Sequence, residues 1–265
     1  MIKKWLEEDQ YTSKTDQLMC VIYSLGITDR RQLQTVTGWT EMQIHGGLQR
    51  IRNLARGNET KDEWLLTWQP TYHSPYVYSL GEKGIQHVRA LKEAAVKFDG
   101  QQPRRGQVSH FMGTNHILCR AIEKGYDVKD WMSAGETLSY LYYQLLPEKS
   151  PVMPDCTICI EGSQHYFGEF DTGKTSGGKL EDKFHKYLNL SNIIGEYFPV
   201  VWVTVKESRK QLLMKKAQDA ILSYERKKKK PLPAKLPEMF FFVEGEETEF
   251  LAGKEQSRSI WSQAI

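Results

Sequence analysis

Three carboxylates and a lysine are spaced so that a short hairpin followed by a helix can bring them together. These residues are Asp155, which follows a proline, Glu169 and Asp171, which stand two apart, and Lys183, which follows a loop rich in Gly, Ser and Lys. Side chains two apart in a strand point to one face, and the first residue of the paired strand lies opposite them. Such carboxylates are ligands for Mg²⁺ or Mn²⁺. Because a bound ion polarises a phosphate ester and supplies hydroxide near neutral pH, the set predicts phosphodiester chemistry.

A lysine beside the carboxylates would stabilise the charge that develops on the phosphate, or would position the attacking water. Lys183 is the first candidate, because its helix directly follows the loop, and Lys174 and Lys179 in or beside the loop are alternatives. Tyr187 stands one turn from Lys183 on the same helix face. It would attack the phosphate and form a covalent intermediate, orient Lys183, or pack against the sheet.

The elements predicted around this set alternate between helix and strand. They are helices over 108–124, 180–192 and 208–225, and strands over 127–132, 155–160, 165–171, 199–205 and 239–243. The strand over 199–205 is apolar almost throughout, which is typical of a strand inside a sheet. The order therefore predicts an α/β sheet flanked by helices.

The first hundred residues predict a separate fold with the pattern of a DNA reader. The expected elements are helices over 15–25, 29–36 and 40–57, strands over 64–68 and 76–80, and a closing helix to about residue 98. Thr28 and Thr40 are expected to cap the second and third helices. A helix-turn-helix followed by a two-stranded hairpin and a closing helix makes a winged helix.

In a winged helix the third helix lies in the major groove, and its exposed early residues contact the bases. The candidates for this role are Thr40, Gln43, His45, Gln49 and Arg50. Phosphate contacts are expected from Arg30, Arg31 and Arg52, with Tyr72 and His73 in the wing. Glu41 is unfavourable near phosphates unless it reads a cytosine. A winged helix that binds another protein is the alternative.

Composition is that of a globular protein, with 265 residues, 40% hydrophobic, 26% charged and a net charge of +3. No apolar run reaches the ~18 residues of a membrane helix, and the N-terminus lacks the apolar core of a secretory signal. We therefore expect a cytoplasmic protein without a membrane segment. Cys156 and Cys159 have Cys-x-x-Cys spacing but no second pair nearby, so we expect reduced thiols rather than a metal or redox site.

A polar stretch with Gly and Pro over 99–107 marks a domain boundary. The predicted division is a winged helix over 1–100, a linker over 101–107, the α/β domain over 108–245 and a C-terminal tail over 246–265. The basic run over 226–230 is expected in an exposed loop, either touching phosphate or simply solvated.

These features together resemble the replication-relaxation family. The resemblance rests on Pro154-Asp155, Glu169-Phe170-Asp171-x-Gly173 and Lys183-x-x-x-Tyr187 placed after a winged helix, over roughly residues 15–205. It implies an N-terminal winged helix-turn-helix followed by a restriction-endonuclease-like, or PD-(D/E)xK, α/β domain. That fold usually carries a lysine where Asp171 stands, so the sequence departs from the pattern there.

The resemblance also implies a function. The family occurs on plasmids and integrative elements and is related to the MOBC class of conjugative relaxases. We expect a Mg²⁺- or Mn²⁺-dependent enzyme that nicks double-stranded DNA at an origin-like site. Glu136 resembles the accessory acid of this fold, which implies an additional metal ligand or an acid that supports the ligands, and a surface role is the alternative. A homodimer and contacts with other replication or conjugation proteins are further expectations. The alternative is a DNA-binding regulator of replication or transcription with a degenerate nuclease domain.

Overall fold

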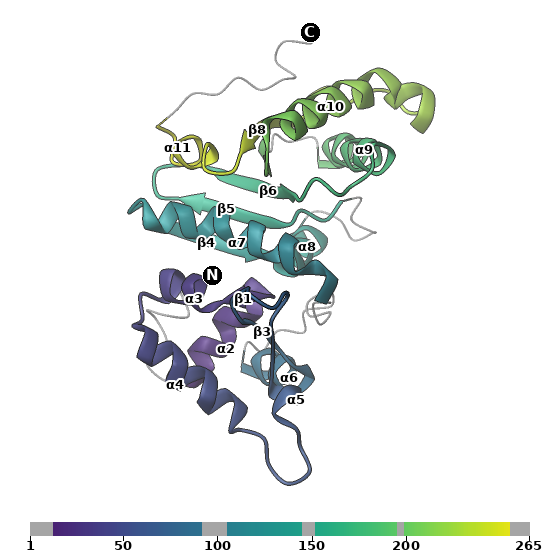
Figure 1. Cartoon of the computed structure of the whole chain (residues 1–265). Helices are drawn as coiled ribbons and strands as arrows, with labels where there is room; N and C mark the ends of the chain where they lie inside the picture. Colours follow the sequence, from purple (N-terminus) through teal and green to yellow (C-terminus); the bar gives the residue numbers. More distant parts are fainter. Residues whose placement is uncertain (1–12, 92–104, 145–151, 195–198, 255–265) are drawn as a thin grey trace.

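The computed structural model describes residues 13–91, 105–144, 152–194 and 199–254 (Figure 1). The first of these ranges forms the predicted winged helix. Its elements are α2 (Lys14–Leu25), β1 (Thr28–Asp29), α3 (Arg30–Thr37), α4 (Glu41–Arg52), α5 (Lys61–Trp64), β2 (Leu65–Trp68), β3 (Val77–Leu80) and α6 (Glu82–Leu91). The three strands form an antiparallel sheet in the order β1-β3-β2. The expected end of the closing helix near residue 98 lies outside the described residues.

The caps of the two central helices explain where they begin. Thr40 accepts a hydrogen bond from the backbone N–H of Gln43 at 3.3 Å, and Gln43 returns one to Thr40 at 2.8 Å, so the predicted cap of α4 is confirmed. The prediction for α3 was wrong by one residue. Asp29 caps this helix through the N–H of Gln32 at 2.8 Å, because Thr28 is buried in β1 opposite Tyr78.

The remaining ranges form the α/β part. Its elements are η1 (Arg105–Gln107), α7 (Val108–Glu123), β4 (Val128–Ser133), α8 (Ala134–Gln144), β5 (Cys156–Ile160), β6 (His165–Asp171), α9 (Gly177–Ile194), β7 (Pro199–Thr204), α10 (Glu207–Lys228), β8 (Glu238–Val243) and α11 (Glu247–Leu251). The sheet has the order β4-β5-β6-β7-β8. Neighbouring strands from β4 to β6 are antiparallel, and those from β6 to β8 are parallel. The predicted mixture of helices and a sheet is confirmed.

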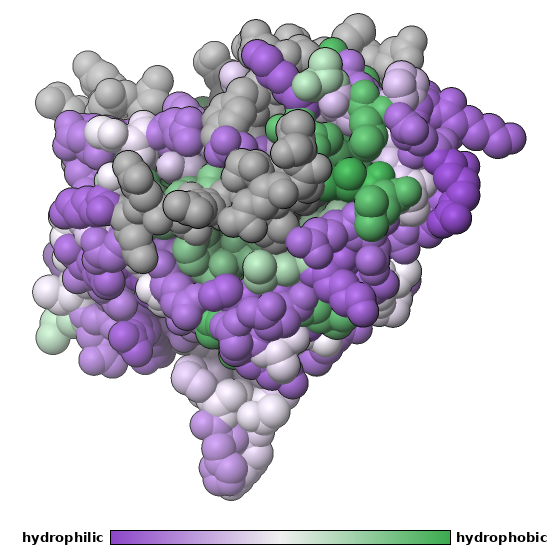
Figure 2. Space-filling view, turned by 90° about the horizontal axis from the view of Figure 1, so that it is seen from above, coloured by the Kyte–Doolittle hydropathy of each residue, from purple (hydrophilic) through white to green (hydrophobic). Residues whose placement is uncertain are grey.

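Helices cover both faces of the sheet. Figure 1 shows α9 and α10 on one face and α7 on the other, between the sheet and the winged helix. Seen from the side of α9 and α10, hydrophilic side chains dominate the rim and apolar ones gather toward the middle (Figure 2). Phe170 of β6 belongs to the core cluster that the sheet shares with α2, whereas Trp202 of β7 packs under α9 with Phe184. No helix in the described ranges could span a membrane.

Two α-helices of the α/β part were not predicted. α8 follows β4 directly, and α11 lies within the stretch that was expected to be a tail. Phe250 and Leu251 of α11 are buried at 7% and 1% exposure, and Phe250 packs against Phe240 of β8. The prediction of a tail over 246–265 therefore fails for 247–251, because this segment completes the core beside β8. Residues 255–265 lie outside the described residues.

Candidate active site

Asp155 and Glu169 face each other at one end of the β5–β6 hairpin. The backbone N–H of Asp155 donates to the carbonyl of Gly168 at 3.0 Å, and Cys156 pairs with Gly168 across the hairpin. The register therefore sets Asp155 beside Glu169, as the spacing predicted. Asp155 is held further by the N–H of Phe170, which donates to Oδ2 at 2.8 Å.

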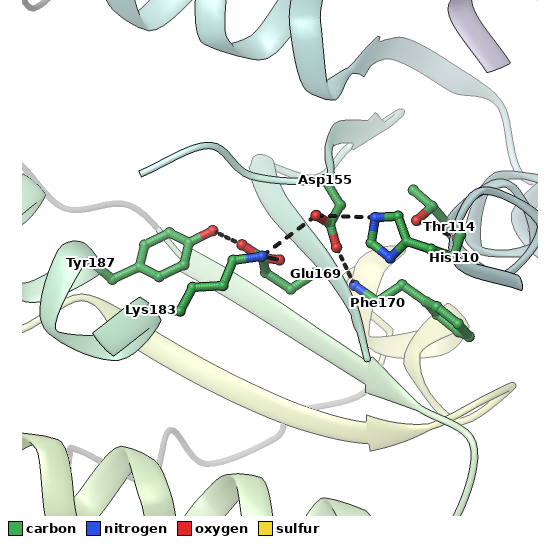
Figure 3. Close-up of polar contacts among 7 residues, drawn as sticks. All are labelled: His110, Thr114, Asp155, Glu169, Phe170, Lys183 and Tyr187. Carbon is green, nitrogen blue, oxygen red and sulfur yellow. Dashed lines mark hydrogen bonds and ion pairs between the residues drawn. The ribbon is translucent and has the colours of Figure 1, made fainter. Parts of the chain in front are cut away.

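Helix α9 brings Lys183 between these two carboxylates (Figure 3). Its Nζ lies 3.5 Å from Asp155 Oδ1 and donates a shorter hydrogen bond to Glu169 Oε2. Tyr187, one turn further along α9, donates from its hydroxyl to Glu169 Oε1. Lys174 and Lys179 are exposed, with Lys174 in the loop and Lys179 in the first turn of α9. The lysine that reaches the carboxylates is therefore the first candidate.

Burial and neighbouring charges shift the pKa values of the clustered residues in different directions. Glu169 is 1% exposed, and this burial, aided by the charge of Asp155, raises its pKa well above the ordinary value despite Lys183. Burial also opposes ionisation of Asp155, but Lys183 and His110 outweigh it and lower the pKa of this carboxyl. The pKa of Lys183 is raised, because the two carboxylates outweigh its burial. Such perturbed groups gathered in one place are typical of functional sites.

His110 is a site residue that the sequence did not reveal. Its Nε2 lies 3.4 Å from Asp155 Oδ1. Burial lowers the pKa of His110, but Asp155 outweighs that effect and the net shift is upward. Thr114 Oγ1 donates to the carbonyl of His110 at 3.0 Å within the same helix. Only the packing of α7 across the sheet brings this histidine to Asp155, so no local signal could have indicated it.

Asp171 lies on the same strand but is paired elsewhere. Arg209 of α10 donates to it twice, from Nε to Oδ2 at 2.5 Å and from Nη2 to Oδ1 at 2.9 Å. The same Nη2 also donates to the carbonyl of Thr175 at 2.7 Å, and the N–H of Gly173 donates to Asp171 Oδ2 at 3.1 Å. Asp171 therefore anchors the loop that leads into α9, and the structure does not join it to the pair formed by Asp155 and Glu169.

Replacing Arg209 by leucine is expected to destabilise the fold by about 3–5 kcal/mol, because it leaves the carboxylate of Asp171 buried and unpaired. The side chains of this pair are only 9% and 2% exposed. Thermal or urea denaturation measures the change. The matched control is Lys210→Leu on the same helix, whose partner Glu246 is 49% exposed, and it should cost at most about 1 kcal/mol. Equal losses in the two variants would contradict the anchoring role of Arg209.

Glu136 stands at the start of α8 rather than on the hairpin. Its Oε2 accepts from the N–H and the hydroxyl of Ser133 at 2.9 and 3.0 Å, and its Oε1 accepts from Ser24 of α2 at 3.3 Å. Glu136 is 6% exposed, so the alternative of a surface role is wrong, and its printed contacts are with Ser133 and Ser24 rather than with the pair formed by Asp155 and Glu169. These contacts are those of a helix cap that also ties α8 to the winged helix.

The donor set fits a magnesium-like ion through two protein ligands. Among the described residues, no three or more His, Cys, Asp or Glu side chains are arranged to hold a metal ion. Asp155 and Glu169, however, converge on one positive charge, the ammonium of Lys183. Mg²⁺ is commonly held by one or two protein carboxylates, with water and substrate phosphate in the other positions. The pair therefore fits such an ion, and Asp171 does not take part in this arrangement.

The predicted DNA-reading residues gather on the exposed face of α4. Ile44, Leu48 and Ile51 are buried. The exposed side chains of this helix are Glu41, Met42, Gln43, His45, Gln49 and Arg50. Arg30 extends this face, with Nη2 3.2 Å from His45 Nδ1 and Nε donating to the hydroxyl of Tyr78 at 3.0 Å.

The other candidates lie at the edge of this face. Thr40 is exposed and takes part in the capping box, where the side chain of Gln43 is also engaged. Arg31 forms an exposed ion pair with Glu123 of α7 at 3.3 Å, and Arg52 is half-buried. The arrangement offers polar and cationic groups along one helix, as a groove-binding helix needs.

The comparison with protein families gives one match. The model of the replication-relaxation family matches residues 20–201, which run from α2 into β7 and include Asp155, Glu169, Lys183 and Tyr187. Comparisons with curated proteins and with solved structures gave no match.

Proposed function

Since the chain belongs to the replication-relaxation family, we propose that it is a Mg²⁺- or Mn²⁺-dependent endonuclease that nicks one strand of duplex DNA at an origin-like site of a plasmid or integrative element. The observation that carries this proposal is the cluster of Asp155, Glu169 and Lys183. Two buried carboxylates that share one cation cost folding free energy, and they are typical of a site kept for chemistry.

Each residue of the cluster has a distinct role in this proposal. Asp155 and Glu169 would hold the ion, which when bound polarises the scissile phosphate and lowers the pKa of water. Asp155 is positioned for this role by the N–H of Phe170 and by His110. Lys183 supplies the positive charge for the developing phosphorane, in place of the lysine that the fold usually carries where Asp171 stands.

Tyr187 fits a positioning role better than a nucleophilic one. Its side chain is completely buried, and its hydroxyl is held by Glu169. Burial, together with the charge of Glu169, raises its pKa well above the usual value. A phosphate could reach this hydroxyl only after α9 moved, so water is the proposed nucleophile.

Replacing Tyr187 by phenylalanine is expected to slow nicking by no more than about tenfold, because one hydrogen bond to Glu169 is lost while the packing is kept. Rates of plasmid nicking measure this effect. Denaturing gels run with and without proteinase should show no strand that carries bound protein. Complete loss of nicking by Tyr187→Phe, together with a protein-linked strand in the unchanged protein, would establish the covalent mechanism instead.

Nicking itself is tested with supercoiled plasmid that carries the origin region of the source element. We expect conversion to open circles in Mg²⁺ or Mn²⁺ and none with a chelator. A chain that binds the origin but leaves it supercoiled at every metal concentration would overturn the proposal.

Binding of the origin region is expected to depend on the exposed face of α4. Arg50→Ala should weaken binding by about tenfold and lower the slope of log K against log salt by about one, because one cationic contact is lost. Titration of a fluorescent duplex at several salt concentrations measures both quantities. Lys129→Ala, which removes an exposed cation from β4, serves as the control and should leave the affinity unchanged. Equal effects of the two substitutions on the affinity would show that the DNA does not bind on α4.

The second candidate function is a DNA-binding regulator without cleavage. The observation in its favour is that Asp171 is paired with Arg209. Two carboxylates of the hairpin rather than three are therefore left to hold a metal ion, and no group of three is found among the described residues. In that case the winged helix would bind the origin, while Lys183 would serve only to neutralise a degenerate site. The plasmid assay separates the two functions directly.

A further inference from the structure

Helix α7 is packed between the winged helix and the strand that carries the candidate active site. Asn115 of α7 is 2% exposed and donates from Nδ2 to the backbone carbonyls of Leu25 at 3.1 Å and Ile27 at 2.9 Å. Gln32 of α3 donates in the opposite direction, from Nε2 to the carbonyl of Met112 at 3.0 Å. Buried amides that pair in both directions hold two elements in one register, because any shift leaves polar groups unsatisfied.

Steric contacts fix the same helix on both of its sides. On the winged-helix side, a Cβ added at Gly26 would lie 2.4 Å from the ring of Phe111. On the sheet side, a Cβ added at Gly113 would lie 2.0 Å from the ring of Phe170, the residue between Glu169 and Asp171. Both glycines therefore permit an approach that a larger residue would prevent, and α7 is closely fitted to both neighbours.

The contact extends along the length of α7. At its C-terminal end Glu123 pairs with Arg31 of α3 at 3.3 Å. Just before its N-terminal end, the guanidinium of Arg105 in η1 lies 5.9 Å from the ring centre of Trp68 in β2. The buried amides lie between these points. The winged helix therefore contacts α7 in its middle and near both of its ends.

The reading helix lies on the other side of this joint. α4 packs on α2, α3, α5 and β2, whereas α3, β1 and the C-terminal end of α2 contact α7. Figure 1 shows α4 at the edge of the molecule away from the five-stranded sheet. The chain of contacts from α4 to the pair formed by Asp155 and Glu169 therefore runs through α3 and α7, and the reading face of α4 is not part of the carboxylate site.

We propose that the chain cuts DNA outside the sequence that it recognises, at one offset that is fixed by the joint through α7. This inference rests on the proposed nicking function and defines its substrate as a duplex with a recognised segment and a separate cut position. A rigid joint allows one separation between α4 and the carboxylates, so a bound duplex presents one phosphate to them. A flexible connection would give a spread of cut positions.

The offset is tested on DNA. Footprinting locates the bound segment, and primer extension locates the nick on the same plasmid. Inserts of about 5 and about 10 base pairs, roughly half a turn and one turn of duplex, are then placed between the two. We expect the nick to keep its distance from the footprint and to fall in new sequence. A nick that stays with its original sequence, or that spreads over many positions, would overturn the fixed offset.

The joint is tested independently of cutting. Spin labels on Gln49→Cys in α4 and Gln218→Cys in α10 report the separation of the two parts, since both positions are exposed and the native cysteines are buried. We expect one narrow distance distribution. It should broaden in Gln32→Ala, and separately in Asn115→Ala, but not in the exposed control Asn53→Ala. A broad distribution in the unchanged joint overturns the inference even if DNA is cut. A narrow distribution without nicking supports the joint and rejects the proposed function.

Discussion

Replacing Glu169 by glutamine is expected to abolish nicking while leaving the protein as stable as before or more stable. The side chain keeps its shape, and its amide oxygen can still accept from Lys183, whose Nζ donates to Glu169. Its NH2 group can only donate, so the contact with the Tyr187 hydroxyl has to reverse. Glutamine can no longer supply a charged ligand. A bound metal ion contributes several kcal/mol to transition-state stabilisation. Because each 1.36 kcal/mol is a factor of ten, we expect the nicking rate to fall by about a thousandfold or more.

The pH dependence of the stability of Glu169→Gln is a second test of this role. Because the pKa of Glu169 is raised in the folded protein, protonation of this carboxyl stabilises the fold. The full stabilisation is present below the ordinary glutamate pKa. This contribution is lost as the pH rises through the raised value. Glutamine does not titrate, so the advantage of Glu169→Gln in thermal denaturation should grow from acid toward neutral pH. Normal nicking by this variant would remove Glu169 from the mechanism. A large fall in its stability would show that the carboxylate is structural.

Replacing Lys183 by methionine is expected to destabilise the metal-free protein by about 2–3 kcal/mol. Methionine keeps much of the packing of the lysine stem, but Asp155 and Glu169 then face each other without a cation. The side chain of Lys183 is 31% exposed, so the loss lies below that of a fully buried pair. Nicking should fall by about a hundredfold or more, as when one charge-stabilising donor is removed.

Metal should restore much of the stability that Lys183→Met loses. If Asp155 and Glu169 bind Mg²⁺ or Mn²⁺, the ion replaces the missing positive charge, and the midpoint of thermal unfolding rises with metal concentration. Lys186→Met, an exposed position on the same helix, is the matched control and should respond no more than the unchanged protein. An equal response of the two variants to metal would show that the carboxylates do not hold the ion.

Much of the site could be predicted because it is built from local rules. The period of two along a strand and the short turn at Glu161–Gln164 place Asp155 opposite Glu169 without any tertiary information. Lys183 and Tyr187 follow from the spacing of one helical turn. The parts that escaped prediction depend on chain segments that are distant in sequence. Arg209, which pairs with Asp171, is 38 residues away in the sequence. Because of this pair, Asp171 is a structural anchor rather than the predicted metal ligand.

The missed helices have related causes. The stretch that became α8 contains Leu and Tyr at several positions without a clear period, so periodicity alone does not separate a strand from a buried helix. α11 has only five residues, too few to show a helical period. Its burial follows from the place where β8 ends beside α7, which the sequence does not reveal. His110 is likewise brought to Asp155 by the packing of α7 on the hairpin, a tertiary contact that the sequence does not reveal.

We propose that Asp155, Glu169 and Lys183 form the cutting site of a metal-dependent nickase. The most direct measurement compares the unchanged protein with Asp155→Asn on supercoiled origin plasmid in Mn²⁺, with gel-shift binding of the same origin measured in parallel. We expect open circles with the unchanged protein only, and equal binding of the origin by both proteins. Open circles formed at the same rate by both proteins would contradict the proposal.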